Sequence, residues 1–220
     1  SILLLSASIA PALAQDAPKL NLDLFPENAV GAVYTFPRHL KAQPEMNLFP
    51  WEVVSAVGSR DLGFDPSEIQ QAVLFVVPPI AGNPPTWGAD LQFDEPVGLA
   101  EELTRPMEKR EANGVAYHAS RRPDEPSFCV FEKTTILIAP EATLTAIIAG
   151  KPGDSPLRKL LADSTSKSAI TAIVAVEPVR ELANQLLIGA PPLPAPLQGL
   201  LTLPGLVDSM TLGLDIAAPY

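Results

Sequence analysis

Short apolar runs rich in Val, Ile, Phe and Tyr recur along the chain, and most of them stop at Pro, Gly or Asn. Runs of this length and composition between turn-forming residues are typical of β-strands. Strands are predicted over residues 29–36, 72–77, 87–93, 114–120, 128–131, 134–138, 169–176 and 210–217. The run at 169–176 holds almost only β-branched residues and Ala, which predicts a strand buried on both faces.

Helix start and stop signals lie between these strands, with Pro or Ser at the beginnings and Gly after the ends. They predict helical segments over residues 50–58, 65–69, 95–110, 141–149, 155–161 and 179–187. Pro106 divides or kinks the third of these segments. The last has the clearest period, because apolar residues follow Val179 at i+3, i+4, i+7 and i+8 before Gly189. The Pro- and Leu-rich residues 190–204 are predicted to be a long connection.

This order of elements predicts an α+β fold, with antiparallel sheets packed against helices and a meander of about three strands in residues 114–139. Glu95-Pro96-Val97 and Glu177-Pro178-Val179 each feed a predicted helix, and the elements around them follow the same order. One hypothesis is a duplicated module of about 85 residues, with a first copy at 29–139 and a second, truncated copy at 140–220. The alternative is coincidence, since Glu-Pro opens many helices.

The first fourteen residues are uncharged and apolar, and they end in Ala12-Leu13-Ala14 before Gln15 and Asp16. A short apolar core followed by small residues is typical of a signal peptide, and it is too short to span a bilayer. We therefore expect residues 1–14 to be a signal peptide that lacks its front residues, and 15–28 to be a flexible lead-in. An apolar strand or a short buried helix is the alternative for the first segment.

The formal net charge of −10 disfavours binding to nucleic acid and to anionic membrane surfaces. The single Cys129 excludes an intramolecular disulfide, so an exported domain of this kind must be stabilised by burial alone. A hydrophobic content of 47% allows such a core. No transmembrane segment is predicted in the mature chain, and the expected location is periplasmic or extracellular.

Ser164-Thr165-Ser166-Lys167 has the Ser-x-x-Lys spacing that places a Lys amine one helical turn from a Ser hydroxyl in penicillin-binding proteins. Neither companion motif, Ser-Asp-Asn or Lys-Thr-Gly, occurs in the chain. The segment is also predicted to be a loop, and a four-residue polar match of this kind arises readily by chance.

Cys129 and His118 lie on neighbouring predicted strands, which allows a thiol–imidazole pair. Against this hypothesis, Cys129 stands between Phe128 and Val130, where a Cys is ordinarily a small apolar core residue. His39 is the only other histidine, so a zinc site has few ligands to draw on. No calcium loop or phosphate-binding loop is found, and no catalytic residue, metal ligand or cofactor is predicted.

Two tryptophans next to predicted loops, Trp51 and Trp87, are candidate binding residues. The alternative is that they pack over the open side of a small sheet. The tract from Pro191 to Pro196 is expected to adopt polyproline II, either as a recognition element or as a stiff crossover.

Pro50-Trp51-Glu52, Gly63-Phe64-Asp65-Pro66 and the run from Thr134 to Leu144 follow the apolar N-terminus and the first strand. This order resembles a group of uncharacterised exported proteins from planctomycete-type bacteria, over about residues 25–180. The resemblance implies export and a duplicated α+β build, and it brings no catalytic residues.

Two functions of different class follow. The favoured hypothesis is an exported, non-catalytic binding or interaction protein of the cell envelope with a protein partner. The alternative is an extracytoplasmic hydrolase whose site assembles in space from Ser164 and Lys167, or from His118 with carboxylates.

Overall fold

The computed structural model describes residues 20–79, 85–123, 125–150, 155–164, 168–181, 205 and 207–214. The strands are β1 Gly31–Thr35, β2 Gln71–Val77, β3 Thr86–Gln92, β4 Glu108–Ala112, β5 Val115–Ala119, β6 Pro126–Phe131, β7 Thr135–Pro140, β8 Ile170–Ala175 and β9 Ser209–Leu214. The helices are α1 Pro37–Lys41, α2 Trp51–Asp61, α3 Glu101–Thr104, α4 Glu141–Ala149 and α5 Pro156–Ala162. Three 3₁₀ turns are described besides them, η1 Pro44–Leu48, η2 Pro66–Glu68 and η3 Glu177–Val179.

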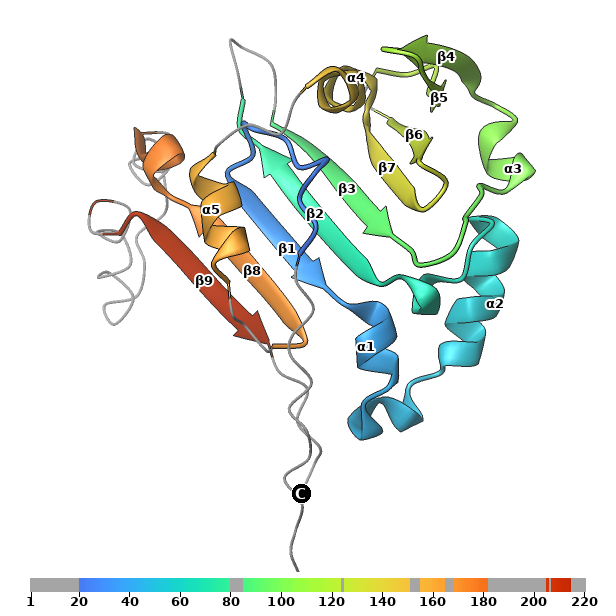
Figure 1. The fold of residues 1–220 in the computed structure, drawn as a ribbon, viewed down its shortest axis with the longest axis horizontal. Helices are drawn as coiled ribbons and strands as arrows, with labels where there is room; N and C mark the ends of the chain where they lie inside the picture. The colour runs from blue at the N-terminus through green and yellow to red at the C-terminus, as the bar shows by residue number, and fades with distance from the viewer. Residues whose placement is uncertain are drawn as a thin grey trace, which may run out of the picture.

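The nine described strands form one antiparallel sheet in the order β4-β5-β6-β7-β3-β2-β1-β8-β9 (Figure 1). The predicted α+β fold is confirmed. Strands β8 and β9 follow the proposed module boundary, yet they extend the same sheet from β1. β1 pairs with β2 across its helical connection, whereas β7 pairs with β3 and β6 rather than with β8. The pairing lends no support to the duplication, which stays a hypothesis.

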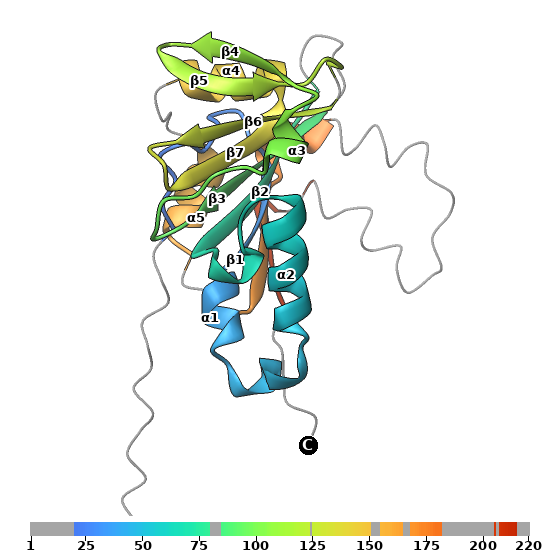
Figure 2. The same cartoon turned by 90° about the vertical axis from the view of Figure 1, so that its right-hand side faces the viewer.

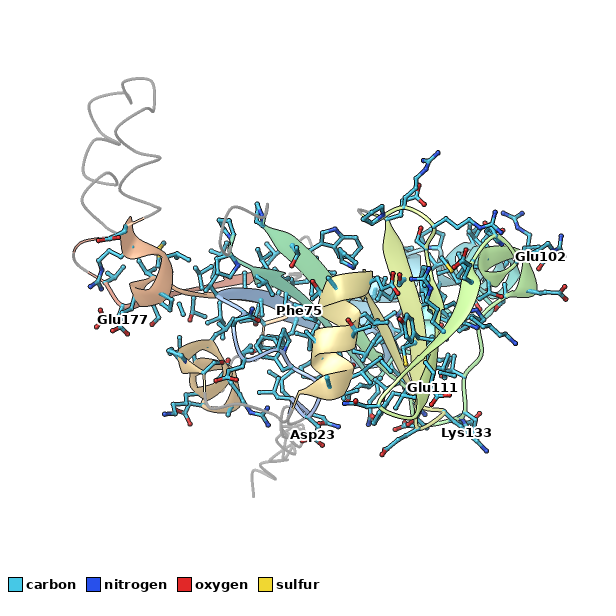
Figure 3. The ribbon with its side chains drawn as sticks, turned by 90° about the horizontal axis from the view of Figure 1, so that it is seen from above. Asp23, Phe75, Glu102, Glu111, Lys133 and Glu177 are labelled. Atoms are coloured by element: carbon cyan, nitrogen blue, oxygen red, sulfur yellow. The ribbon has the colours of Figure 1, made fainter. Side chains whose placement is uncertain are left out.

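Helices α4 and α5 and residues 20–29 cover one face of the sheet, the covered face. Val73, Phe75 and Val77 of β2 point to it and are 1%, 0% and 6% exposed. In Figure 1 α5 crosses in front of β1 and β8, and Figure 3 places α5 and Asp23 on the same side of the sheet. The main hydrophobic core therefore lies between this face and the helices.

The predicted loose lead-in is wrong for the part of it that the structure describes, residues 20–28. The Gln71 side chain accepts a hydrogen bond from the Asn21 backbone N–H (2.7 Å) and donates one to the Asn21 carbonyl (2.8 Å). Arg158 of α5 donates to the carbonyl of Leu22 at 2.9 Å. Leu22 and Phe25 are buried in the main core. Two buried side chains and these side-chain hydrogen bonds fix the segment in place. It has no regular secondary structure, so no periodic sequence pattern could predict that it is ordered.

A second, smaller cluster covers the opposite face near α2 and η2. Its buried members are Phe64, Ile69, Phe93 and Ile136. A Cβ on Gly58 of α2 would lie 2.1 Å from Pro66 Cδ, so α2 meets η2 at a position where only glycine fits. Figure 2 shows α2 on the side of the sheet opposite to α5.

Of the helix predicted over residues 95–110, only Glu101–Thr104 is helical, as α3; the prediction is wrong for residues 95–100 and again beyond Thr104. Residues 108–112 form β4 and fold back on β5 through a turn at Asn113 and Gly114, whose φ angles are 48° and 78°. Asn-Gly is the strongest short-range signal for a two-residue hairpin turn, so this turn could have been predicted from the sequence. The meander therefore has four strands, β4 to β7.

The β6–β7 hairpin turns at Glu132 and Lys133, with φ angles of 49° and 66°. A left-handed backbone costs a non-glycine residue roughly 1–2 kcal/mol, so we expect Lys133→Gly to raise the free energy of unfolding by about 1 kcal/mol. Urea denaturation measures the change. Gly114→Ala, at the corresponding position of the Asn-Gly turn, should lower it by a similar amount, and equal signs for the two variants would contradict this account.

Several other predicted elements agree with the structure. Ser155 caps α5, since its Oγ accepts a hydrogen bond from the Arg158 N–H at 3.1 Å. The strand prediction for 169–176 is right, but Val174 is 39% exposed, so burial on both faces is wrong. Most of the helix predicted over 179–187 and the connection at 190–204 lie outside the described residues. Among the residues described, no helix is long and apolar enough to cross a membrane.

Candidate functional site

Five neighbouring strands, β3, β2, β1, β8 and β9, leave much of the face opposite α5 exposed; we call this surface the open face. Its central side chains come from four of these strands and are 39–51% exposed: Val33, Leu74, Val76, Trp87 and Val174. Pairing in register puts them on one side of the sheet, because Val33 lies opposite Leu74 and Val76 lies opposite Trp87. The open face is therefore one continuous apolar surface.

Strand β9 extends the open face to the margin of the described sheet. Met210, Leu212 and Leu214 are 50%, 72% and 59% exposed. They lie opposite residues 174, 172 and 170 of β8, so their side chains point to the same side as Val174. Exposed apolar patches of several hundred Å² on one protein commonly mark binding surfaces.

The positions on the open face hold Gly, Ala, Thr, Val, Ile, Leu, Met and Trp, and none of them in these five strands is charged. Charged residues begin just past the strand ends, and several of them form ion pairs. Arg38 forms ion pairs with Glu68 (3.9 Å) and Asp94, and Arg180 pairs with Asp208 at 2.6 Å. The open face can therefore lose water without leaving a charge unpaired.

The structure does not bring the two candidate tryptophans together. Trp87 lies near the end of β2 marked by Val76, while α2, which begins at Trp51, belongs to the connection between the opposite ends of β1 and β2. The Trp51 ring packs on Phe49 with centroids 4.6 Å apart. Its indole nitrogen is enclosed and has no acceptor among the described residues. Of the two, Trp87 belongs to the open face.

Ser164 lies beside the covered face, where its Oγ is 2.7 Å from the Tyr34 hydroxyl. Lys167, the other member of the Ser-x-x-Lys motif, lies outside the described residues. The hydrogen bond to Tyr34, which is 3% exposed, gives Ser164 a structural role beside β1.

Cys129 and His118 point to opposite faces of the sheet. His118 lies directly opposite Phe128, so the next residue, Cys129, turns to the other side, where it is fully buried. Burial raises the pKa of the Cys129 thiol to about 11, which keeps it protonated at neutral pH. Desolvation and the nearby Lys109 lower the pKa of His118. In the described part of the chain, His118 forms no ion pair with a carboxylate, and the thiol–imidazole hypothesis is wrong.

Asp90 is the buried carboxyl group of the sheet, 2% exposed on the covered face opposite Val73. Its Oδ2 accepts a hydrogen bond from the Gln92 side chain at 3.0 Å, and its Oδ1 has no partner among the described residues. Burial raises the pKa of Asp90 to about 6, against the effect of the Gln92 hydrogen bond, and the Asp23 carboxylate adds to the rise. Among the residues described, no three His, Cys, Asp or Glu side chains gather in a way that could hold a metal ion.

The open face was not predicted from the sequence, because a wholly apolar strand usually indicates burial on both faces. Residues 72–77 are apolar at every position, and an antiparallel strand with that pattern has two apolar faces to cover. Phe75 is covered, whereas Leu74 and Val76 are not. The signal was present in the sequence, but which face is covered depends on where the helices pack.

Comparisons with known proteins place the chain in no family. No protein family matches it, and no curated protein matches it significantly. One solved structure, described as crystal form I of TP0453, is 10% identical over 82% of this chain and 69% of that chain, with a TM-score of 0.40. A similarity this low supports no inference about function.

Proposed function

We propose that this chain is an exported, non-catalytic interaction protein of the cell envelope, and that its open face binds an apolar surface of a protein partner. The observation that carries the proposal is the uncharged open face around Trp87. Export is supported by the signal-like residues 1–14.

Charge defines the partner further. The formal net charge of −10 favours association with a protein whose apolar contact surface has a cationic margin, because opposite charges speed the encounter. An anionic lipid surface is repelled by the same charge. Apolar contact on the open face supplies affinity, and the basic margin supplies orientation.

Leu74→Glu tests this function, because it places a charge at the middle of the open face. We expect at least about a tenfold loss of affinity for a partner captured from the envelope fraction, since the buried carboxylate has no counter-charge there. Titration of the captured protein by biolayer interferometry measures the loss, and added salt should weaken the wild-type complex.

Val53→Glu is the matched control. Val53 is 60% exposed on α2, outside the open face, and the substitution adds the same charge. Equal losses in Leu74→Glu and Val53→Glu would reject the open face as the binding surface. Binding that strengthens with salt would reject a cationic partner.

A further inference from the structure

The last strand of the described sheet, β9, has backbone groups that point away from β8. The N–H of Val176 donates to the Asp208 carbonyl at 2.8 Å, so residues 176 and 208 form a hydrogen-bonded pair. Such pairs recur at every second residue of an antiparallel ladder. Residues 210, 212 and 214 therefore bond to β8, while the N–H and C=O groups of Ser209, Thr211 and Gly213 face outward.

The two margins of the sheet differ in chemistry. At the other margin β4 has the sequence Glu-Lys-Arg-Glu-Ala and is exposed along most of its length, so its charges discourage another strand from pairing there. The β9 sequence, Ser-Met-Thr-Leu-Gly-Leu, has neither a charge nor a proline. Figure 3 shows these margins at opposite ends of the molecule, with Glu177 at the β9 end and Glu102 at the other. Of the two margins, β9 is the one suited to strand addition.

An antiparallel margin is complementary to its own copy, because a two-fold axis relates the two strands. One register bonds Thr211 of each copy to Gly213 of the other through the outward groups. That register places Leu212 opposite Leu212 of the second copy, and Met210 opposite Leu214. The three exposed apolar side chains of β9 then meet only one another, and register follows the apolar pattern wherever a face becomes buried.

We propose that two copies of this chain associate through β9, which pairs with β9 of the second copy across a two-fold axis at Leu212. The two sheets become one, and the two open faces become a single surface. A dimer of this kind presents two partner-binding faces side by side, which raises avidity for a partner that offers two contact surfaces. The association uses the sheet margin, so it stands whether or not the open face binds a partner.

Leu212→Cys tests the pairing directly. Residues opposite each other in a non-hydrogen-bonded antiparallel pair have Cα atoms about 4.5 Å apart, which lies within disulfide range. We expect Leu212→Cys to form a disulfide-linked dimer under mild oxidation, seen on non-reducing gels. The native Cys129 is fully buried and does not compete. Added salt should increase the yield, because each copy carries a net charge of −10 and repels the other.

Two control variants test the register of the β9 pair and the backbone hydrogen bonds between the two copies. Met210→Cys, 50% exposed in the wild type, should cross-link at least about tenfold more slowly, because it faces Leu214 of the second copy. Thr211→Pro removes one outward N–H and leaves the β8 ladder intact, so it should abolish the cross-link in the Leu212→Cys chain. Leu74→Glu should leave the cross-link unchanged, which separates this association from partner binding at the open face.

Two results would overturn the proposal. A Leu212→Cys thiol that reacts quickly with maleimide yet stays monomeric would mean that the β9 margin is free. A thiol protected from maleimide in a monomer would mean that the chain covers its own margin.

Discussion

Replacing Phe75 with alanine is expected to lower the free energy of unfolding by about 3–5 kcal/mol, the usual range for a buried Phe in a core. Phe75 is fully buried at the middle of the sheet, where Figure 3 labels it. The Phe75 and Phe25 rings pack in a T-shaped arrangement with centroids 5.7 Å apart, so Phe75 joins β2 to the segment before β1. Urea denaturation followed by circular dichroism measures the loss.

Gly88 makes the Phe75 prediction specific to one contact. It lies directly opposite Phe75, and a Cβ there would approach Phe75 Cζ to 2.3 Å. Gly88→Ala alone should cost about 1–3 kcal/mol through overpacking. In the Phe75→Ala chain the same change should cost much less, since the ring is gone. Additive losses in this double-mutant cycle would show that Gly88 is needed for another reason, such as its approach to the Ile138 carbonyl.

Local signals were sufficient to predict most of the regular elements. Ser155 with Pro156 identifies the start of α5, and the hairpin of β6 and β7 follows from β-forming runs on both sides of a short polar turn. These predictions hold because capping and turn formation depend on residues close together in the chain. Strand order could not be predicted in this way. Strands β1 and β8 pair although more than a hundred residues separate them in the chain, and no local pattern encodes that pairing.

Strand β4 shows how tertiary pairing overrides local preference. Residues 108–111 are charged, and the helix predicted from the sequence reached residue 110. The turn at Asn113 and Gly114 commits them to pair with β5, and their ladder hydrogen bonds outweigh a small difference in intrinsic propensity.

Strand β3 shows why the candidate site could not be predicted fully. Its alternation puts Trp87, Ala89 and Leu91 on one face and Asp90 on the other, which suggests that the apolar side is covered and the polar side is wet. The structure has Trp87 41% exposed and Asp90 2% exposed. Residues 20–29 produce this result, because the backbone of Asn21 gives Gln71 and Gln92 hydrogen-bond partners on the covered face.

The second large effect concerns Asp90 and pH. The pKa of Asp90 is about 6 in the folded protein, against an ordinary value of 3.8 in the unfolded chain. The folded protein therefore keeps this proton up to a higher pH than the unfolded chain does. The folded state therefore loses stability as pH rises from about 4 to about 6, and the loss levels off above that range. A difference of about two pKa units corresponds to about 3 kcal/mol.

Asp90→Asn should remove this part of the pH dependence. The free energy of unfolding is measured in urea at pH 4 and at pH 7.5. We expect its decrease between these two pH values to be about 3 kcal/mol smaller in the variant than in the wild type. At pH 4 the variant should be no more stable than the wild type, because Asp90 is protonated there and its hydroxyl can donate a hydrogen bond. Above pH 7 the variant should be the more stable protein, because it buries no charge.

Asp23→Asn is the control for the Asp90 experiment. Asp23 is exposed and adds to the rise in the Asp90 pKa only through its charge, so the variant should keep the pH dependence with a smaller amplitude. Parallel pH profiles for the wild type and Asp90→Asn would mean that Asp90 is solvated in the folded protein. In that case water would occupy the space between β3 and the segment that contains Asn21. It would supply the hydrogen-bond partner that Asp90 Oδ1 lacks among the described residues.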